Sequence, residues 1–402
     1  MSTPKAERAR AANGDGISSE PTAPAVRSRG LARMVGALRA EGSFMLAVVV
    51  IGLVKLIASS PEIGEVGHFG PLTEVLLVLI FGVVVYAAIG VVGHAELLAE
   101  KYGEPYGTLI LTLAAVTVEV VMLTTMVLHL ENNPTLARDT IFATVMILVN
   151  GLIGLSLLIG GMRYGEQRYN VKSSKAFLTM LFALTGLALI LPDAVTPAQE
   201  PRLEVFLVFA SILLYGFFLH VQTRKHTHFF VFDGSPKEHG SPEHASGAGS
   251  RSEISGAYHA TMLVATIIAL SVLVEYLSIA LDDTMDVLHF PAQIPALVVA
   301  IIVASPESLA AIRAAVHNDM QRTFNIALGS ALSTVALTIP AVLVISFIAG
   351  RGVILGLTPV QGSLMIISLL VASITEADGS TSALEGMVQL VLFGSFVVMV
   401  LA

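Results

Sequence analysis

The chain alternates long apolar segments with short polar ones along most of its length. Each apolar segment is close to the ~20 residues that a helix needs to cross a bilayer. The pattern therefore predicts an all-α polytopic membrane protein with about eleven transmembrane helices. The predicted helices cover residues 44–60, 75–95, 107–130, 140–162, 174–192, 203–222, 257–281, 292–316, 323–349, 353–375 and 384–401.

Two polar segments divide the chain into domains. Residues 1–41 are rich in Ala, Arg, Gly, Ser and Pro and predict a disordered, basic cytoplasmic tail. Residues 223–256 are rich in Gly, Ser and Pro and predict a flexible cytoplasmic linker. This linker separates a first membrane half, residues 42–222, from a second half, residues 257–402. The linker histidines could hold a regulatory metal or could simply be solvated; they are His226, His228, His239 and His244.

The number of predicted helices on each side of the linker indicates internal symmetry. Six precede it and five follow it. With the first helix set aside, each half contributes five, and because five is odd the second set must run opposite to the first. We therefore expect two inverted five-helix repeats plus one extra N-terminal helix. In secondary transporters of this design the substrate site lies near the middle of the bilayer, between the repeats.

Composition and charge narrow the class of partners. With 54% hydrophobic and 13% charged residues, most of the chain belongs in lipid. The net charge of −8 argues against a nucleic-acid partner. No cysteine is present, which excludes disulfides and thiolate chemistry. Nothing in the sequence calls for a cofactor.

The basic residues predict the orientation, because cytoplasmic loops collect Lys and Arg. If the N-terminus is cytoplasmic and the C-terminus outside, the opposite face holds only Arg138, Arg202 and Arg351. The inner loops then hold Lys101, Arg163, Arg168, Lys172, Lys175, Arg224, Lys225, Lys237, Arg251, Arg313 and Arg322. This pattern favours a bacterial inner membrane protein in that orientation.

Two helices each carry a lone glutamate two residues after a hydroxyl residue. Glu119 follows Thr117, and Glu307 follows Ser305. A carboxylate in hydrocarbon costs several kcal/mol, so such residues usually mark an ion path or a proton relay. Because the repeats are inverted, Glu119 and Glu307 are predicted to face each other from antiparallel helices and to bind cation or proton.

Nearby polar groups are candidates for supporting ligands. Pro306 lacks an amide hydrogen, so the carbonyl of Ile302 loses its helical partner and is predicted to be free at a helix break. The helices after each glutamate contain amide and hydroxyl groups among small residues, which suit either ligation or close helix packing. For each hydroxyl the alternative is a bond to a carbonyl of its own helix. The candidates are Thr112, Thr117, Asn150, Ile302, Ser305, Asn325 and Ser330.

Three further acids, Glu376, Asp378 and Glu385, fall in the inner loop before the last predicted helix. We expect them to be solvated.

Several motifs resemble a known family. The run from Gly93-His94-Ala95-Glu96 through Gly103-Glu104-Pro105 to Val118-Glu119-Val120 is similar to the first α-repeat of bacterial sodium/calcium:proton antiporters of the ChaA type. Ala304-Ser305-Pro306-Glu307 and the run Asn325 to Pro340 resemble the second repeat. These antiporters belong to the calcium:cation antiporter superfamily. The resemblance implies an inverted-repeat bundle in which the two glutamates bind cation or protons alternately. One departure is that the common Gly-Asn before the first glutamate is absent here.

The predicted function is therefore a secondary active transporter, not an enzyme, that exchanges a cation for protons. Hard oxygen ligands suit Ca²⁺ or Na⁺, with K⁺ as a further candidate. One alternative is a cation channel, although no selectivity-filter repeat or charged ring is evident. Another is a membrane-embedded hydrolase, for which Ser305 would need a His or Lys at mid-depth to activate it.

Overall fold

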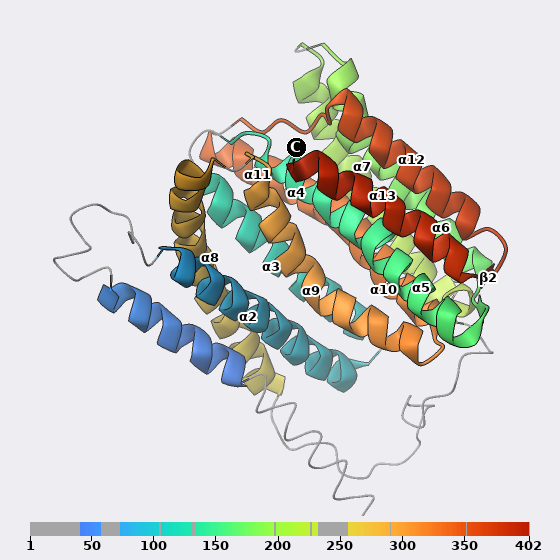
Figure 1. Cartoon of the computed structure of the whole chain (residues 1–402), viewed down its shortest axis with the longest axis horizontal. Helices are drawn as coiled ribbons and strands as arrows, with labels where there is room; N and C mark the ends of the chain where they lie inside the picture. Colours follow the sequence, from blue (N-terminus) through green and yellow to red (C-terminus); the bar gives the residue numbers. More distant parts are fainter. Residues whose placement is uncertain are drawn as a thin grey trace, which may run out of the picture. The chain divides into compact units, whose positions relative to one another are not determined.

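The computed structural model describes residues 41–57, 73–103, 106–129, 133–196, 198–225, 227–231, 256–289, 291–350 and 352–401 (Figure 1). It is almost wholly helical. A helix over residues 41–57 comes first. The single-segment helices that follow are α2 (Thr73–Tyr102), α3 (Tyr106–His129), α7 (Glu200–His220), α8 (Gly256–Leu288), α9 (Ile294–Val316), α12 (Pro359–Thr375) and α13 (Ala383–Leu401).

The remaining spans are built from several helical segments. They are α4 (Leu136–Val145), η2 (Met146–Leu152) and α5 (Ile153–Tyr164); α6 (Val171–Thr185), η3 (Gly186–Ile190) and η4 (Leu191–Ala194); and α10 (Met320–Ser333), η7 (Thr334–Thr338) and α11 (Ile339–Ala349). Strands β1 (Gln167–Arg168) and β2 (Ser380–Thr381) pair antiparallel. Each of the eleven predicted helices is therefore present in the described part of the chain. Nine described helices are long and apolar enough to cross a membrane, and α12 is a shorter apolar helix.

The helix predicted over residues 353–375 is shorter in the structure. Residues 353–358 are apolar enough to suggest helix, yet the structure leaves them extended, with Ile354 N–H bonded to the Pro134 carbonyl and Leu357 N–H bonded to the Leu189 carbonyl. Helix α12 begins only at Pro359, because Thr358 and Gln361 form a capping box and proline suits the first helical turn.

A buried ion pair fixes the start of α12 beside the start of α4. Arg138 Nε lies 3.0 Å from Asp139 Oδ1. Arg138 also donates to the Gly356 carbonyl at 2.8 Å, and Gln361 Nε2 donates to Asp139 Oδ1 at 3.1 Å. A buried ion pair is tolerated when its remaining hydrogen-bonding capacity is satisfied in this way. Arg138, expected on the outer face, therefore joins the ends of two spans.

The packing has the predicted inverted-repeat symmetry. Helix α3 packs on α8 and η7, and its counterpart α9 packs on α2 and η2. Likewise α5 packs on α13 as α11 packs on α7, and η7 packs on α6 as η2 packs on α12. When each helix of the first repeat, α2 to α7, is exchanged with its counterpart in the second repeat, α8 to α13, each of these contacts becomes another contact that is present. In Figure 1, α9 lies between α2 and α5.

Both repeats interrupt their third span with a π-helical segment, η2 in the first and η7 in the second. Such segments are rare in proteins as a whole, but those that occur are often found at functional sites.

The α5–α13 contact depends on the absence of side chains at two glycines, because a Cβ at Gly386 would lie 2.7 Å from the Gly154 carbonyl oxygen. Glycine at both positions lets the two helices approach closely.

The linker prediction was too wide at its start. Residues 221–225 and 227–229 form short helical turns, and the Phe230 ring packs at 5.4 Å from Phe177 and 5.8 Å from Phe218. Aromatic burial therefore anchors this part of the chain to α6 and α7. Residues 232–255, and all of the predicted tail (1–41) except residue 41, lie outside the described residues. So do His226, His239 and His244, and His228 is exposed.

Candidate functional site

Glu119 lies in the middle of α3 and is 2% exposed. Its Oε2 accepts a hydrogen bond of 3.0 Å from the Thr334 hydroxyl of η7. Its Oε1 is buried and has no hydrogen-bond partner among the described residues. A buried oxygen without a partner costs free energy unless something binds it, so Oε1 is available to a cation or a proton.

Glu307 lies in α9, directly after Pro306. The residue is half-buried, and its Oε2 is buried without a partner in the described part of the chain. Helices α3 and α9 pack together, and the two carboxyl groups are close enough to interact electrostatically. The structure therefore brings the two predicted glutamates together from different repeats.

The π-helical segments supply two more buried oxygens. Asn150 in η2 is 0% exposed; its amide nitrogen lies 3.4 Å from Met146 Sδ, and its Oδ1 has no described partner. Thr338 in η7 is also 0% exposed, and its hydroxyl is equally without a described partner. Segment η2 packs on α9, and η7 packs on α3. Each glutamate helix thus contacts a segment with an unsatisfied oxygen.

Sequence reasoning selected Asn150 but missed Thr334 and Thr338. A signal was available. Asn150 follows Glu119 by 31 residues, and Thr338 follows Glu307 by the same 31. In an inverted repeat, equal spacing identifies corresponding positions, so Thr338 is the counterpart of Asn150.

The hydroxyl residues just before each glutamate bond within their own helices. Thr117 donates to the Leu113 carbonyl at 2.6 Å, and Ser305 donates to the Ile301 carbonyl at 2.5 Å. The structure therefore matches the alternative considered for them. The helix break expected at Pro306 is also absent, because α9 runs without interruption from Ile294 to Val316. Proline still leaves the Ile302 carbonyl without a helical N–H partner, although the helix stays continuous.

Other predicted ligands lie in different surroundings. The Thr112 side chain lies beside the Tyr215 hydroxyl of α7. Asn325 accepts from Ser173 at 2.8 Å and donates to the Phe230 carbonyl at 2.8 Å. Ser330 is half-buried, and its carbonyl accepts from Ser333 at 2.9 Å. The amide of Asn325 is thus occupied in contacts with α6 and the segment after α7, away from the glutamate pair's described partners.

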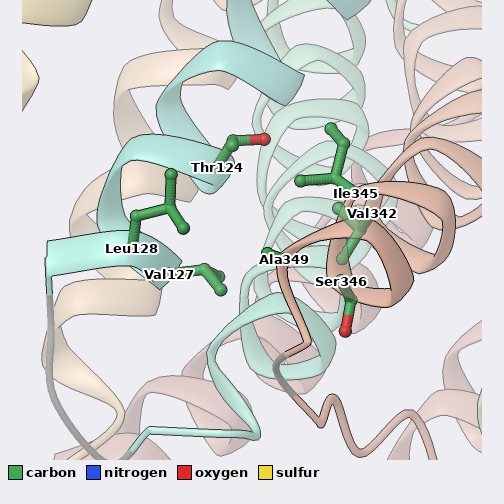
Figure 2. Close-up of a pocket in the computed structure, with 7 residues that line it drawn as sticks. All are labelled: Thr124, Val127, Leu128, Val342, Ile345, Ser346 and Ala349. Carbon is green, nitrogen blue, oxygen red and sulfur yellow. The ribbon is translucent and has the colours of Figure 1, made fainter.

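A small pocket lies between α3 and α11, beyond Glu119 toward the end of α3 (Figure 2). Figure 2 shows the Thr124 hydroxyl directed toward Ile345 across the gap. Apart from Thr124 and Ser346 the lining is apolar; the other lining residues are Val127, Leu128, Val342, Ile345 and Ala349. Two hydroxyls without a carboxylate are a poor cation site, so this pocket adds no candidate for ion binding.

Comparison with known proteins gives the family. The profile of the sodium/calcium exchanger protein family matches residues 72–224 and 258–402, most of the chain. The chain belongs to the sodium/calcium exchanger family. This membership confirms the resemblance drawn from the motifs. The match falls in two parts that leave out the helix over 41–57 and the middle of the chain.

Two bacterial proteins are similar to this exchanger in sequence. The putative ionic transporter y4hA of Sinorhizobium fredii is 36% identical over 334 residues, which cover 81% of this chain and 88% of that protein. The sodium-potassium/proton antiporter ChaA of Escherichia coli is 34% identical over 318 residues, covering 79% and 86%. Both alignments span most of each chain.

Solved structures show the same fold. Native YfkE superposes with a TM-score of 0.67 at 17% identity, covering 91% of this chain and 99% of that chain. The H⁺/Ca²⁺ exchanger CAX superposes with a TM-score of 0.60 at 16% identity, covering 90% and 88%. At these identities the likeness concerns the fold alone.

Replacement of Thr334 tests the polar contact to Glu119. Thr334→Val keeps the side-chain shape but removes the hydroxyl, and a hydrogen bond to a charged group contributes about 1.5–3 kcal/mol. We expect the cation concentration for half-maximal transport to rise by about tenfold or more. Thr334→Ser, which keeps the hydroxyl, is the matched control and should stay near the parent value. Equal behaviour of the valine variant and the parent would remove Thr334 from the site.

Proposed function

We propose that this exchanger moves a cation across the membrane in one direction and protons in the other, at a single site formed by Glu119 and Glu307. The observation that carries the proposal is the pair itself. Two carboxyl groups from different repeats interact across the α3–α9 contact, and each has a buried oxygen without a described partner.

The mechanism follows from charge in a low-dielectric site. A buried carboxylate needs a neutralising partner, and either a proton or a cation can serve. Both cannot hold the same oxygen, so arrival of the cation expels protons and arrival of protons expels the cation. Exchange follows if the loaded site can face either side of the membrane and the empty, doubly charged site cannot. Rocking of one repeat against the other supplies that alternation in transporters of this design.

The oxygen-only donor set favours hard cations. Carboxylate, amide and hydroxyl oxygens suit Ca²⁺, Na⁺ or K⁺ rather than soft metals. The names of the relatives, a sodium-potassium/proton antiporter and an H⁺/Ca²⁺ exchanger, support the same group of ions. We place the protein in a bacterial inner membrane, with the N-terminus cytoplasmic and the C-terminus outside, on the distribution of basic residues.

The two alternatives receive less support. A channel needs a continuous polar path, whereas the pocket between α3 and α11 is nearly all apolar. A hydrolase needs an activated nucleophile, whereas the Ser305 hydroxyl donates a hydrogen bond to a carbonyl of its own helix.

Proton flux in everted vesicles tests the proposal. Vesicles that hold a respiration-driven proton gradient should lose part of it when the transported cation is added, with a saturable dependence on cation concentration. Na⁺, K⁺ and Ca²⁺ are added separately, and vesicles without the protein are the control. Cation uptake that carries current but moves no protons would contradict exchange and favour the channel.

A further inference from the structure

Outside the glutamate pair and the Arg138–Asp139 ion pair, the described residues bury one more carboxyl group. Glu376 is 1% exposed, and both of its carboxyl oxygens lack a hydrogen-bond partner within the described residues. The sequence had predicted a solvated loop residue. Glu376 instead ends α12, in the turn that leads to β2 and α13.

Among the described residues, no positive charge compensates Glu376. The groups that act on it are the Ser174 hydroxyl of α6 and the Glu385 carboxyl of α13. The Tyr169 hydroxyl is also buried without a described partner, and its ring lies near Glu376, Glu385 and Asp378. The basic residues that neighbour Tyr169 and Ser174 in the sequence are exposed; they are Arg168, Lys172 and Lys175. Carboxylates and hydroxyls therefore make up the titratable and polar groups that face Glu376.

The helix itself disfavours a charge at this position. Glu376 caps the C-terminal end of α12, where the helix dipole is negative. A buried anion without a cation partner is costly, and the group is expected to neutralise by taking up a proton. Burial raises the pKa of Glu376 to about 8.

The segment after Glu376 is held by backbone pairing with the segment before α6. Gly379 adopts a φ of +78°, a left-handed conformation that favours glycine, and turns the chain so that β2 pairs with β1. The Tyr169 N–H donates to the Gly379 carbonyl at 3.1 Å. Thr381 is 3% exposed and donates to the Gln167 carbonyl at 3.4 Å. We call Gln167–Arg168 and Ser380–Thr381 the β1–β2 ribbon.

We propose that Glu376 is a second proton-binding site, separate from the exchange site, and that loss of its proton opens the β1–β2 ribbon. The closed ribbon keeps the carboxyl group dry, and that environment tolerates only the neutral acid. Once charged, the carboxylate is stabilised by water, which reaches it when the ribbon separates.

The ribbon also contacts the end of the helix that carries Glu307. Gln167 Nε2 donates to the Ala315 carbonyl at 3.2 Å and to Asn318 Oδ1 at 3.0 Å. Ala315 lies at the end of α9, the helix that carries Glu307. Opening of the ribbon would therefore release contacts that hold one end of α9.

The pH dependence has a defined sign. In the open form Glu376 is hydrated and titrates near its ordinary value, whereas in the closed form its pKa is higher. The closed form thus binds more protons, and a rise in pH favours opening. The opening equilibrium should increase by up to tenfold per pH unit between about pH 5 and pH 8.

Thiol labelling of the purified, full-length protein measures this opening. The chain has no cysteine, so Thr381→Cys places a single thiol in the buried strand β2. Its labelling rate is compared at each pH with that of the Thr381→Cys, Glu376→Gln protein. The comparison cancels the pH dependence of the thiol, and glutamine keeps the volume without titrating.

We expect the ratio of the two rates to rise at least tenfold between pH 5.5 and pH 8.5. Asp378→Asn, which removes an exposed carboxylate from the same turn, should leave that rise intact. A ratio that stays flat with pH overturns the proposal, as does a rise that Asp378→Asn abolishes. Slower labelling on addition of Na⁺ or Ca²⁺ at constant pH would also overturn it, because the ligand would then be a cation. None of these results depends on transport, so they are independent of the exchange mechanism.

Discussion

Replacement of either Glu119 or Glu307 by glutamine is expected to reduce cation-driven proton exchange to background. Glutamine keeps the volume and the polarity of the side chain but can neither bind a proton nor carry charge. Removal of one partner from a buried charged site typically costs about 3–5 kcal/mol, which corresponds to a loss of at least about a hundredfold. Exchange is measured as proton flux in vesicles at matched amounts of inserted protein.

Glu275→Gln provides the control, because Glu275 is also a glutamate within a spanning helix, α8. This variant should retain most of the exchange activity. If either Glu119→Gln or Glu307→Gln retained as much activity as Glu275→Gln, the shared site would have to be placed elsewhere.

Cation affinity should weaken as pH falls, because protons and the cation compete for the same carboxyl oxygens. The expected change is up to tenfold per pH unit for each proton displaced, or about 1.4 kcal/mol per unit. The sign is fixed by the competition, since a lower pH fills the site with protons. Calorimetric titration of the purified protein between pH 6 and pH 8 gives the dissociation constant directly.

Proton release provides an independent check on the same competition. Addition of the cation to protein in weak buffer should acidify the solution in proportion to the cation bound, and the Glu119→Gln protein should release less. A dissociation constant unaffected by pH, together with no proton release, would indicate separate paths for the cation and the proton.

The spanning helices were predictable from the sequence because lipid imposes a local rule. Backbone polar groups in hydrocarbon must bond within their own helix, so each span needs a long apolar segment that can be read without knowledge of its neighbours. The same rule made Glu119 and Glu307 conspicuous. The inverted symmetry followed from the parity of the helix count, and the packing of α3 on η7 and α9 on η2 agrees with it.

The partners of those glutamates depended on the tertiary structure. Thr112 lies in α3, the helix of Glu119, and Asn325 lies in α10, the helix after α9. Yet Asn325 bonds to Ser173, and Thr112 lies beside Tyr215. Thr334 reaches Glu119 across 215 positions of sequence. Which face of one helix meets which face of another depends on packing over the whole interface, and hydropathy along a single segment does not contain that information.

Glu376 and residues 353–358 are two further places where contacts between distant segments overrode the local sequence pattern. A carboxylate in a short polar loop looks solvated, but Glu376 is buried next to β2, which pairs with β1 more than 200 positions earlier in the chain. Residues 353–358 look helical, but two of their N–H groups donate hydrogen bonds to distant carbonyls, those of Pro134 just before α4 and Leu189 in η3. The sequence by itself determined which segments enter the membrane and which acids are costly there. Only the tertiary structure decided which of those acids are buried together and what satisfies them, because burial and hydrogen bonding arise from contacts between distant segments.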